Sequence, residues 1–231
     1  MFNNLVEFLE GMDNVAVAIR LVLATLCGSL IGWERVSKRH SAGIRTFALV
    51  SLGSAVATVL NIYLAILPGL DADVSRIPAG VVSGIGFLGA GTIIVTGRNQ
   101  IKGLTTAASL WVASCMGMAF GAGYLSVGFV CFLLVMIANI ILVHLSTQIE
   151  ENSRFVSIYI EVEETNGVKK LRKKFAEDGF TISSMNKTKD KTLLGSDIAL
   201  MVDLDFGTKM AHQPFINELN ELDFVSYVEE V

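Results

Sequence analysis

Residues 15–33 read VAVAIRLVLATLCGSLIGW, an apolar stretch that contains a single charged residue, Arg20. A helix of about 20 mainly apolar residues is long enough to cross the hydrocarbon core of a bilayer. The stretch therefore predicts a membrane-spanning helix. A charged residue in a span is costly, so Arg20 is interpreted in two ways: its side chain reaches the lipid headgroups, or it has a functional role.

Four more apolar stretches follow at residues 44–67, 77–96, 104–122 and 124–145, joined by short connections. The chain is 52% hydrophobic and only 17% charged, whereas soluble domains carry about 25% charged residues. Most of the acidic residues lie after residue 145. We therefore predict a multi-pass α-helical membrane bundle of about five transmembrane helices over residues 1–145, and a second domain over residues 146–231.

Basic residues mark alternate connections between the predicted spans. Arg35, Lys38 and Arg39 follow the first span, and Arg98 and Lys102 follow the third. The other connections contain almost no Lys or Arg. Because connections rich in these residues stay in the cytoplasm, we predict an N-terminus outside and a cytoplasmic C-terminal domain.

Two groups of charged residues lie at the edges of the spans. Glu34, Arg35 and Arg45 are predicted at the cytoplasmic edge, and Asp73 and Arg76 at the outer start of the third helix. The cytoplasmic group is either a cluster that meets anionic lipid or an ion-paired gate or cation site. Opposite charges so placed should pair, because removal of one partner leaves the other unpaired in a region of low dielectric.

Other polar residues in or near the spans have simpler interpretations. Asn61 and Asn139 are expected to form hydrogen bonds between helices. Asp71 and Asp73 offer oxygen ligands of the kind that suits Mg²⁺ or Ca²⁺, although carboxylates in a loop are more often simply solvated. The sequence therefore assigns no metal site. The three cysteines lie in apolar runs without a CxxC spacing and are interpreted as small apolar residues.

The third predicted span is unusually rich in glycine, with Gly80, Gly84, Gly86, Gly89 and Gly91. Gly80 and Gly84 form a GxxxG pair, which allows another helix to approach closely. Glycine at this density also eases unwinding, as in the broken helices of transporters. These residues are thus helix-packing glycines or, alternatively, the backbone lining of a pathway.

Two short motifs resemble catalytic signatures but lack the required context. Residues 84–89, GIGFLG, fit the GxGxxG pattern, which needs a preceding strand and a soluble βαβ unit. Asp190, Lys191 and Thr192 are similar to the phosphorylation motif of P-type ATPases, but Leu193 follows where that motif has glycine. The sequence shows no Ser–His–Asp arrangement and no paired carboxylates inside a span. We therefore expect no enzyme and no cofactor.

The C-terminal part has the patterns of a small α+β domain. Residues 155–162, FVSIYIEV, alternate apolar and polar as a half-buried strand does. A helical stripe, two strands, a second helix and a last strand follow, which gives the order βαββαβ of the ferredoxin-like split βαβ arrangement. We expect residues from about 153 onward to fold alone, and an exposed sheet face or edge to favour self-association.

Six motifs in the membrane part carry a resemblance to a known family. They are GWER (32–35), AGIRT (42–46), LVSLGSAV (49–56), DVSRI (73–77), VVSGIGFLGAG (81–91) and KGLTTAASLWV (102–112). In this order they resemble the MgtC/SapB family of bacterial inner-membrane proteins, with small departures at Val36 and Val74. The C-terminal part is similar, in topology only, to the ACT-type domain of the MgtC-like branch.

The resemblance implies an inner-membrane protein that adapts bacteria to low Mg²⁺ and, in some members, supports the intracellular survival of pathogens. It implies a non-enzymatic regulator of other membrane proteins, including the F-type ATP synthase. The expected partners are the lipid bilayer, other membrane proteins and a second copy of the chain, most simply in a dimer, and no nucleic acid. The alternative is a transporter or channel for a divalent cation, with backbone carbonyls of the glycine-rich helix along its pathway.

Overall fold

The structure is a computed structural model that describes residues 7–37, 42–70, 73–96, 101–188, 192 and 197–231. The chain divides into two compact units. The membrane unit comprises Met1–Ile94 and Ile101–Leu142, and the C-terminal unit comprises Val95–Gln100 and Val143–Val231. Each unit has a buried apolar cluster of its own.

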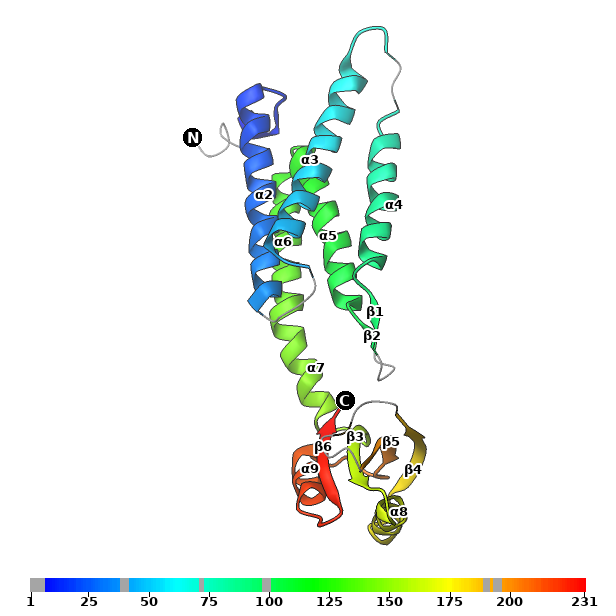
Figure 1. Ribbon diagram of the computed structural model, residues 1–231. Coiled ribbons are helices and arrows are strands. Elements are labelled where there is room, and N and C mark those ends of the chain that lie inside the picture. The colour runs from blue at the N-terminus through cyan, green and yellow to red at the C-terminus, as the bar shows by residue number, and fades with distance from the viewer. Residues whose placement is uncertain (1–6, 38–41, 71–72, 97–100, 189–191, 193–196) are drawn as a thin grey trace. The chain divides into compact units, whose positions relative to one another are not determined.

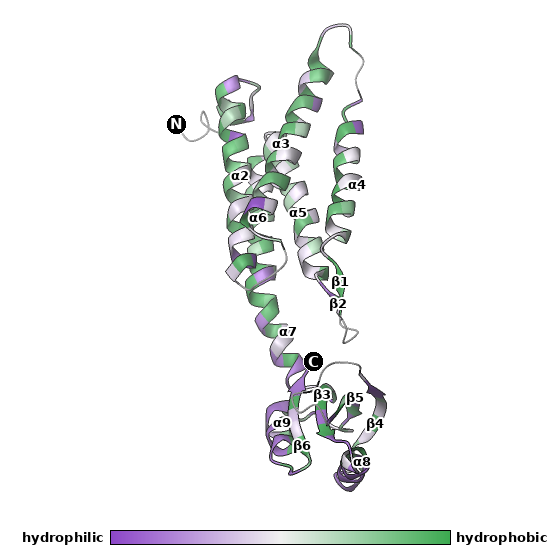
Figure 2. Cartoon of the chain, viewed as in Figure 1, coloured by the Kyte–Doolittle hydropathy of each residue, from purple (hydrophilic) through white to green (hydrophobic). Residues whose placement is uncertain are grey.

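Four helices are long and apolar enough to cross a membrane (Figure 1). They are α2 (Asn14–Ser37), α3 (Ile44–Ile66), α5 (Leu104–Gly121) and a continuous helix over Leu125–Glu150. Apolar residues predominate along all four (Figure 2). Large apolar side chains such as Leu26, Leu49 and Leu133 are more than half exposed. This is expected of helices whose outer faces contact lipid.

The third predicted span needs correction. Helix α4 covers Arg76–Ala90 and has 15 residues, whereas the hydropathy pattern continues to residue 96. At 1.5 Å per residue this helix is about 22 Å long, less than the hydrocarbon core of about 30 Å. The number of helices with the length of a full span is therefore four in the described chain, where about five were predicted.

Helix α4 ends early because the chain turns after Gly91. The Thr92 hydroxyl donates to the carbonyl oxygen of Gly89 at 2.8 Å, and the Thr92 amide donates to the same oxygen at 3.0 Å. The chain then forms a two-stranded sheet of β1 (Ile94–Val95) and β2 (Ile101–Lys102). A short apolar run is compatible with either a helix or a strand. The predicted span therefore extended beyond the end of α4 into residues that form β1.

Helices α2 and α3 run antiparallel and touch through glycines of α2. A Cβ atom added to Gly28 would lie 2.7 Å from the carbonyl oxygen of Phe47, and one added to Gly32 would lie 2.6 Å from Cα of Ile44. Such distances leave no space for a side chain. The two glycines are four residues apart and share one face of α2, so α3 packs directly on this backbone.

Helices α3 and α5 run parallel, again in contact through glycines. A Cβ atom on Gly117 would lie 2.2 Å from the carbonyl oxygen of Ser51, and one on Gly121 would lie 2.4 Å from that of Ala55. Because both helices point the same way, the chain between them must return along the bundle. Helix α4 is the helical part of that return.

The last long helix changes its hydrogen bonding along its length. Gly123, with a φ of 89°, makes the turn after α5. Helix α6 (Leu125–Ile137) then passes into the π-helical segment η1 (Ala138–Leu142) and continues as α7 (Val143–Glu150). Segments of π-helix inside α-helices occur often at functional sites.

The C-terminal unit is a four-stranded antiparallel sheet with two helices. Its elements are β3 (Phe155–Glu163), α8 (Gly167–Glu177), β4 (Thr181–Lys187), β5 (Asp197–Asp205), α9 (His212–Asn220) and β6 (Val225–Glu230). The strands lie in the order β4-β5-β3-β6. Alternate residues of β3, such as Ile158 and Ile160, are fully buried against Leu171, Phe175 and Phe215 of the helices. The ACT-type identity of this unit stays a prediction.

Candidate functional site

Glu34 and Arg35 lie in the last turn of α2. Arg35 is fully buried, and its Nε lies 3.1 Å from Oε2 of Glu34, whose side chain is 8% exposed. Arg35 follows Gly32 by three residues and shares the face of α2 that packs on α3. Within the described chain, Nη2 of Arg35 has no hydrogen-bond partner. Buried charge of this kind is costly, so the pair is the strongest functional candidate of the membrane unit.

Arg45 is not part of this ion pair. It lies in the first turn of α3 with an exposed side chain, and no ion pair joins it to any residue that the structure describes. The structure thus brings together two of the three charges predicted at this edge. Arg45 remains a surface cation of the kind that meets lipid phosphates. Lys38 and Arg39 lie outside the described residues.

Asp73 organises the turn before α4. Its Oδ1 accepts hydrogen bonds from the amide and the hydroxyl of Ser75, at 2.8 and 2.7 Å. These bonds hold the pKa of Asp73 below its usual range, and the charge of Arg76 has the smallest effect on it. Arg76 itself is exposed. The Asp73 carboxylate therefore bonds to Ser75 and not to the Arg76 guanidinium. Asp71 lies outside the described residues.

Arg20 is enclosed by protein and does not extend to the surface. Its Nη2 lies 3.8 Å from the sulfur of Met12, while Nε and Nη1 have no hydrogen-bond partner among the described residues. Nη1 lies against Gly123, where an added Cβ atom would approach it to 2.6 Å. The carbonyl end of α5 is at this turn, and the negative end of a helix dipole favours a cation. Arg20 thus connects α2 with the α5–α6 turn.

A stripe of small polar side chains follows one face of α3. Its members, Ser51, Ser54, Thr58 and Asn61, are all buried. The Ser54 hydroxyl lies 2.8 Å from that of Ser114 on α5, and Nδ2 of Asn61 donates to the carbonyl oxygen of Val74 at 2.8 Å. The stripe therefore ties α3 to α5 and to the chain that leads into α4.

Asn139 lies in η1 and is 3% exposed. Its Oδ1 accepts a hydrogen bond from the Ser109 hydroxyl at 3.3 Å, which links the last long helix to α5. The widened helix turn of η1 coincides with this buried amide.

The glycines of α4 differ from one another in their surroundings. An added Cβ atom would meet nothing within 4 Å at Gly80, Gly84 or Gly86, whereas Gly89 packs on Ala107 of α5 and Gly91 lies against its own helix. Close packing within the chain is instead made by two other pairs at the same GxxxG spacing, Gly28 with Gly32 and Gly117 with Gly121. These four glycines were not among the residues predicted from the sequence, although their GxxxG spacing was the available signal.

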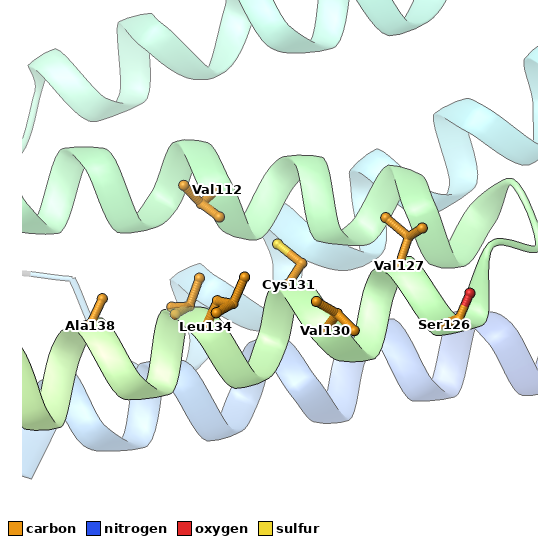
Figure 3. Close-up of a pocket in the computed structure, with 8 residues that line it drawn as sticks. Val112, Ser126, Val127, Val130, Cys131, Leu134 and Ala138 are labelled. Carbon is orange, nitrogen blue, oxygen red and sulfur yellow. The ribbon is translucent and has the colours of Figure 1, made fainter.

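Apolar hollows open among the described residues of the membrane unit. One, of about 550 Å³, lies between α5 and α6, where Figure 3 shows Val112 opposite Cys131 and Leu134. Another, of about 350 Å³, lies between α3, α4 and α5, with Gly84 on its wall. The hydroxyls of Ser54 and Ser114 are its polar groups. Neither hollow has a charged lining residue.

Metal-binding side chains do not gather at one place in the described chain. No group of three or more His, Cys, Asp or Glu side chains could hold a metal ion there. The site that the structure offers is therefore a set of buried charges and hydroxyls that join helices.

Apolar spans with buried charges, joined to a separate α+β unit, define a multi-pass membrane protein. Residues 21–148 match the MgtC family. Because this match covers more than half of the chain, the chain belongs to that family, and the resemblance seen in the sequence motifs is confirmed.

Several named relatives are similar to about half of this chain. The putative magnesium transporter YhiD of Escherichia coli is 43% identical over 114 residues, which is 48% of this chain and 53% of that protein. Protein MgtC of Brucella abortus is 41% identical over 119 residues, 52% of this chain and 48% of the relative. Protein SapB of Bacillus subtilis is 36% identical over 126 residues, 53% of this chain and 54% of the relative.

The chain spans about half the length of the curated relatives it matches. No solved structure gives a significant match.

Proposed function

We propose that this chain is a non-enzymatic regulator of Mg²⁺ homeostasis in the bacterial inner membrane, acting as a dimer by contact with other membrane proteins. The closed packing of α2, α3 and α5 carries this proposal. Gly28 and Gly32 on one side, and Gly117 and Gly121 on the other, bring both neighbours into backbone contact with α3. Mg²⁺ gives up its water reluctantly, and this packing leaves no space for a hydrated ion between the three helices.

The surface of α4 supports contact with other membrane proteins. Phe87 is 84% exposed and Leu88 is 53% exposed, and α4 is shorter than a full span. An apolar helix that is short and open on one side offers a surface to a neighbouring transmembrane helix. The family resemblance makes the F-type ATP synthase one candidate for that neighbour.

The link to Mg²⁺ rests on family membership. One relative carries the name putative magnesium transporter, so Mg²⁺ is either the signal to which the regulator responds or its cargo.

A divalent-cation transporter is the alternative function, and one observation favours it. The cavity of about 350 Å³ beside α4 is lined by the Ser54 and Ser114 hydroxyls and by Gly84. Gly84 leaves its backbone accessible on that wall, and backbone carbonyls can coordinate ions. A pathway along α4, outside the closed contact of α2, α3 and α5, is the form this alternative takes.

Ion flux distinguishes the two functions. The purified full chain is reconstituted into vesicles that contain a fluorescent Mg²⁺ indicator, and Mg²⁺ is added outside. A regulator leaves the signal equal to that of protein-free vesicles. Protein-dependent Mg²⁺ entry that is lost in Gly84→Leu but retained in Gly86→Leu contradicts the regulator and assigns the cavity as the pathway.

Contact with partners is tested in cells. A photo-crosslinking amino acid at position 87 should capture another membrane protein, and the product should increase in low-Mg²⁺ medium. The same label at position 26, on the exposed face of α2, serves as the control. Equal capture from both positions, with no response to Mg²⁺, would count against a regulatory surface on α4.

A further inference from the structure

His212 is the first residue of α9, and both nitrogens of its ring have a hydrogen-bond partner. It is 2% exposed. Its Nδ1 lies 2.6 Å from Oε1 of Glu230 on β6, and its Nε2 lies 3.1 Å from the carbonyl oxygen of Ser153. Ser153 belongs to residues 151–154, the segment that joins α7 to β3. The ring therefore connects this joining segment with both α9 and β6.

These two bonds depend on a proton that can be lost. A carbonyl oxygen only accepts, so Nε2 must carry a hydrogen toward Ser153. The bond to Glu230 needs a second hydrogen, whether the ring N–H or the carboxyl O–H donates it. Loss of that proton leaves a nitrogen lone pair facing a carboxylate at 2.6 Å. Imidazole changes charge within about pH 5 to 8 in ordinary surroundings.

Backbone hydrogen bonds of the joining segment lie beside the ring contact. The His212 amide donates to the carbonyl oxygen of Glu151 at 3.0 Å, and the Met210 amide donates to that of Ser153 at 3.4 Å. Both bonds join residues 151–154 to the start of α9. Their amides are therefore direct reporters of whether the segment is held.

The other groups around the ring are an apolar side chain and charged side chains that point elsewhere or pair elsewhere. Phe206 contributes an apolar ring, with centroids 5.7 Å apart. From the joining segment, Arg154 is ion-paired with Asp205, and the Glu151 side chain is exposed. The Glu230 carboxylate contacts the ring directly, at 2.6 Å from Nδ1.

We propose that His212 and Glu230 form a pH-sensitive latch, which fastens residues 151–154 to α9 and β6 at low pH and releases them as the pH rises. The latch lies inside the C-terminal unit, on the segment between α7 and β3, so it controls how firmly that segment is held to α9 and β6. The proposal is independent of whether the chain regulates or transports.

Hydrogen exchange tests the latch in the full chain held in lipid nanodiscs. Protection factors, corrected for the intrinsic effect of pH on exchange, are measured for peptides that contain Met210 and His212 at pH 5.5 and pH 8.5. We expect protection at these amides to fall about tenfold at the higher pH, the ratio that corresponds to one charge-assisted hydrogen bond. The strands of the sheet should keep their protection.

Glu230→Gln is the decisive variant. A glutamine amide donates to the neutral ring, so the latch should stay closed at both values of pH. His144→Gln, which changes an exposed histidine, should behave like the wild type. Wild-type protection that does not depend on pH, or an unchanged dependence in Glu230→Gln, overturns the proposal.

A second measurement covers the case in which Glu230→Gln does not fold. The ¹⁵N shifts of the His212 ring in the wild type should change from a doubly to a singly protonated ring over the same interval. A ring that keeps one protonation state throughout also overturns the proposal.

Discussion

At the scale of single residues, the glycines of the membrane unit differ in how closely a neighbouring helix approaches them. A side chain at Gly117 would meet the Ser51 carbonyl oxygen at 2.2 Å, whereas one at Gly84 would meet nothing within 4 Å. Overpacking of a tight contact costs about 1–3 kcal/mol. We therefore predict that Gly117→Ala lowers the thermal unfolding midpoint in detergent, while Gly84→Ala leaves it near that of the wild type. Equal midpoints for both variants would contradict the packing.

The buried ion pair of α2 gives a second prediction at this scale. Glu34→Ala leaves the buried Arg35 without its carboxylate, and breaking a buried pair on one side costs about 3–5 kcal/mol. We expect less protein in the membrane by immunoblot and poor growth in low-Mg²⁺ medium. Glu7→Ala, which removes an exposed carboxylate, is the matched control and should behave like the wild type.

A double variant separates stability from function at the same pair. Replacing both residues, as Glu34→Gln with Arg35→Met, removes both charges and should restore the amount of protein. If growth then remains poor, the charges act in function. If Glu34→Ala grows like the wild type at equal abundance, the assignment of this pair as a functional site is wrong.

At the scale of elements, hydropathy predicted the long helices because it sums over about 20 residues. It placed the end of α4 too late, since residues 93–95 continue the apolar run although the chain has already turned at Thr92. The sequence also did not decide which arginine pairs with Glu34, because Arg35 and Arg45 were both predicted at the same edge of the membrane. The pairing depends on which face of α2 packs on α3. The glycine contacts determine that face, and the spacing of the charges does not.

The C-terminal unit is predicted to fold without the membrane unit. Its core is formed by residues between Val156 and Val228 alone, so no buried apolar contact in this cluster comes from the membrane helices. A fragment of residues 153–231 should give the circular dichroism spectrum of a mixed α and β protein. A random-coil spectrum would count decisively against independent folding.

One ion pair makes the stability of that fragment depend on pH. Arg154, with the amide of Gly207, lowers the pKa of Asp205 to about 2, from about 3.9 in a model peptide. Because the pKa is lower in the folded state, the stabilisation is present above about pH 4 and is lost as the pH falls to about 2.

Urea unfolding of Asp205→Asn tests this dependence. We expect the variant to be less stable than the wild-type fragment at pH 7 and equal to it near pH 2. Glu164→Gln, at an exposed turn position, should match the wild type at pH 7. A difference between Asp205→Asn and the wild type that persists unchanged at pH 2 would show that charge is not its cause.

At the scale of the whole molecule, the directions of the helices constrain where the chain enters and leaves the membrane. Helix α3 is antiparallel to α2 and parallel to α5. Helix α6 turns back beside α5, since Gly128 lies against Phe120. The start of α2 and the end of the membrane unit at Leu142 are therefore at opposite ends of the bundle. The chain thus crosses from one side to the other.

The orientation of the chain in the membrane is predicted from the Lys and Arg residues in alternate connections between the spans. These residues predict a cytoplasmic C-terminus. A reporter enzyme that is active only in the periplasm should be silent when fused after Val231 and active when fused after Gly69, in the turn that follows α3. A fusion after Thr96 tests whether α4, which has only 15 residues, crosses the membrane. The parallel contact of α3 and α5 requires that α4 returns the chain across the membrane, so this fusion should be silent. Activity after Thr96 would mean that α4 does not cross, and activity after Val231 would reverse the predicted orientation.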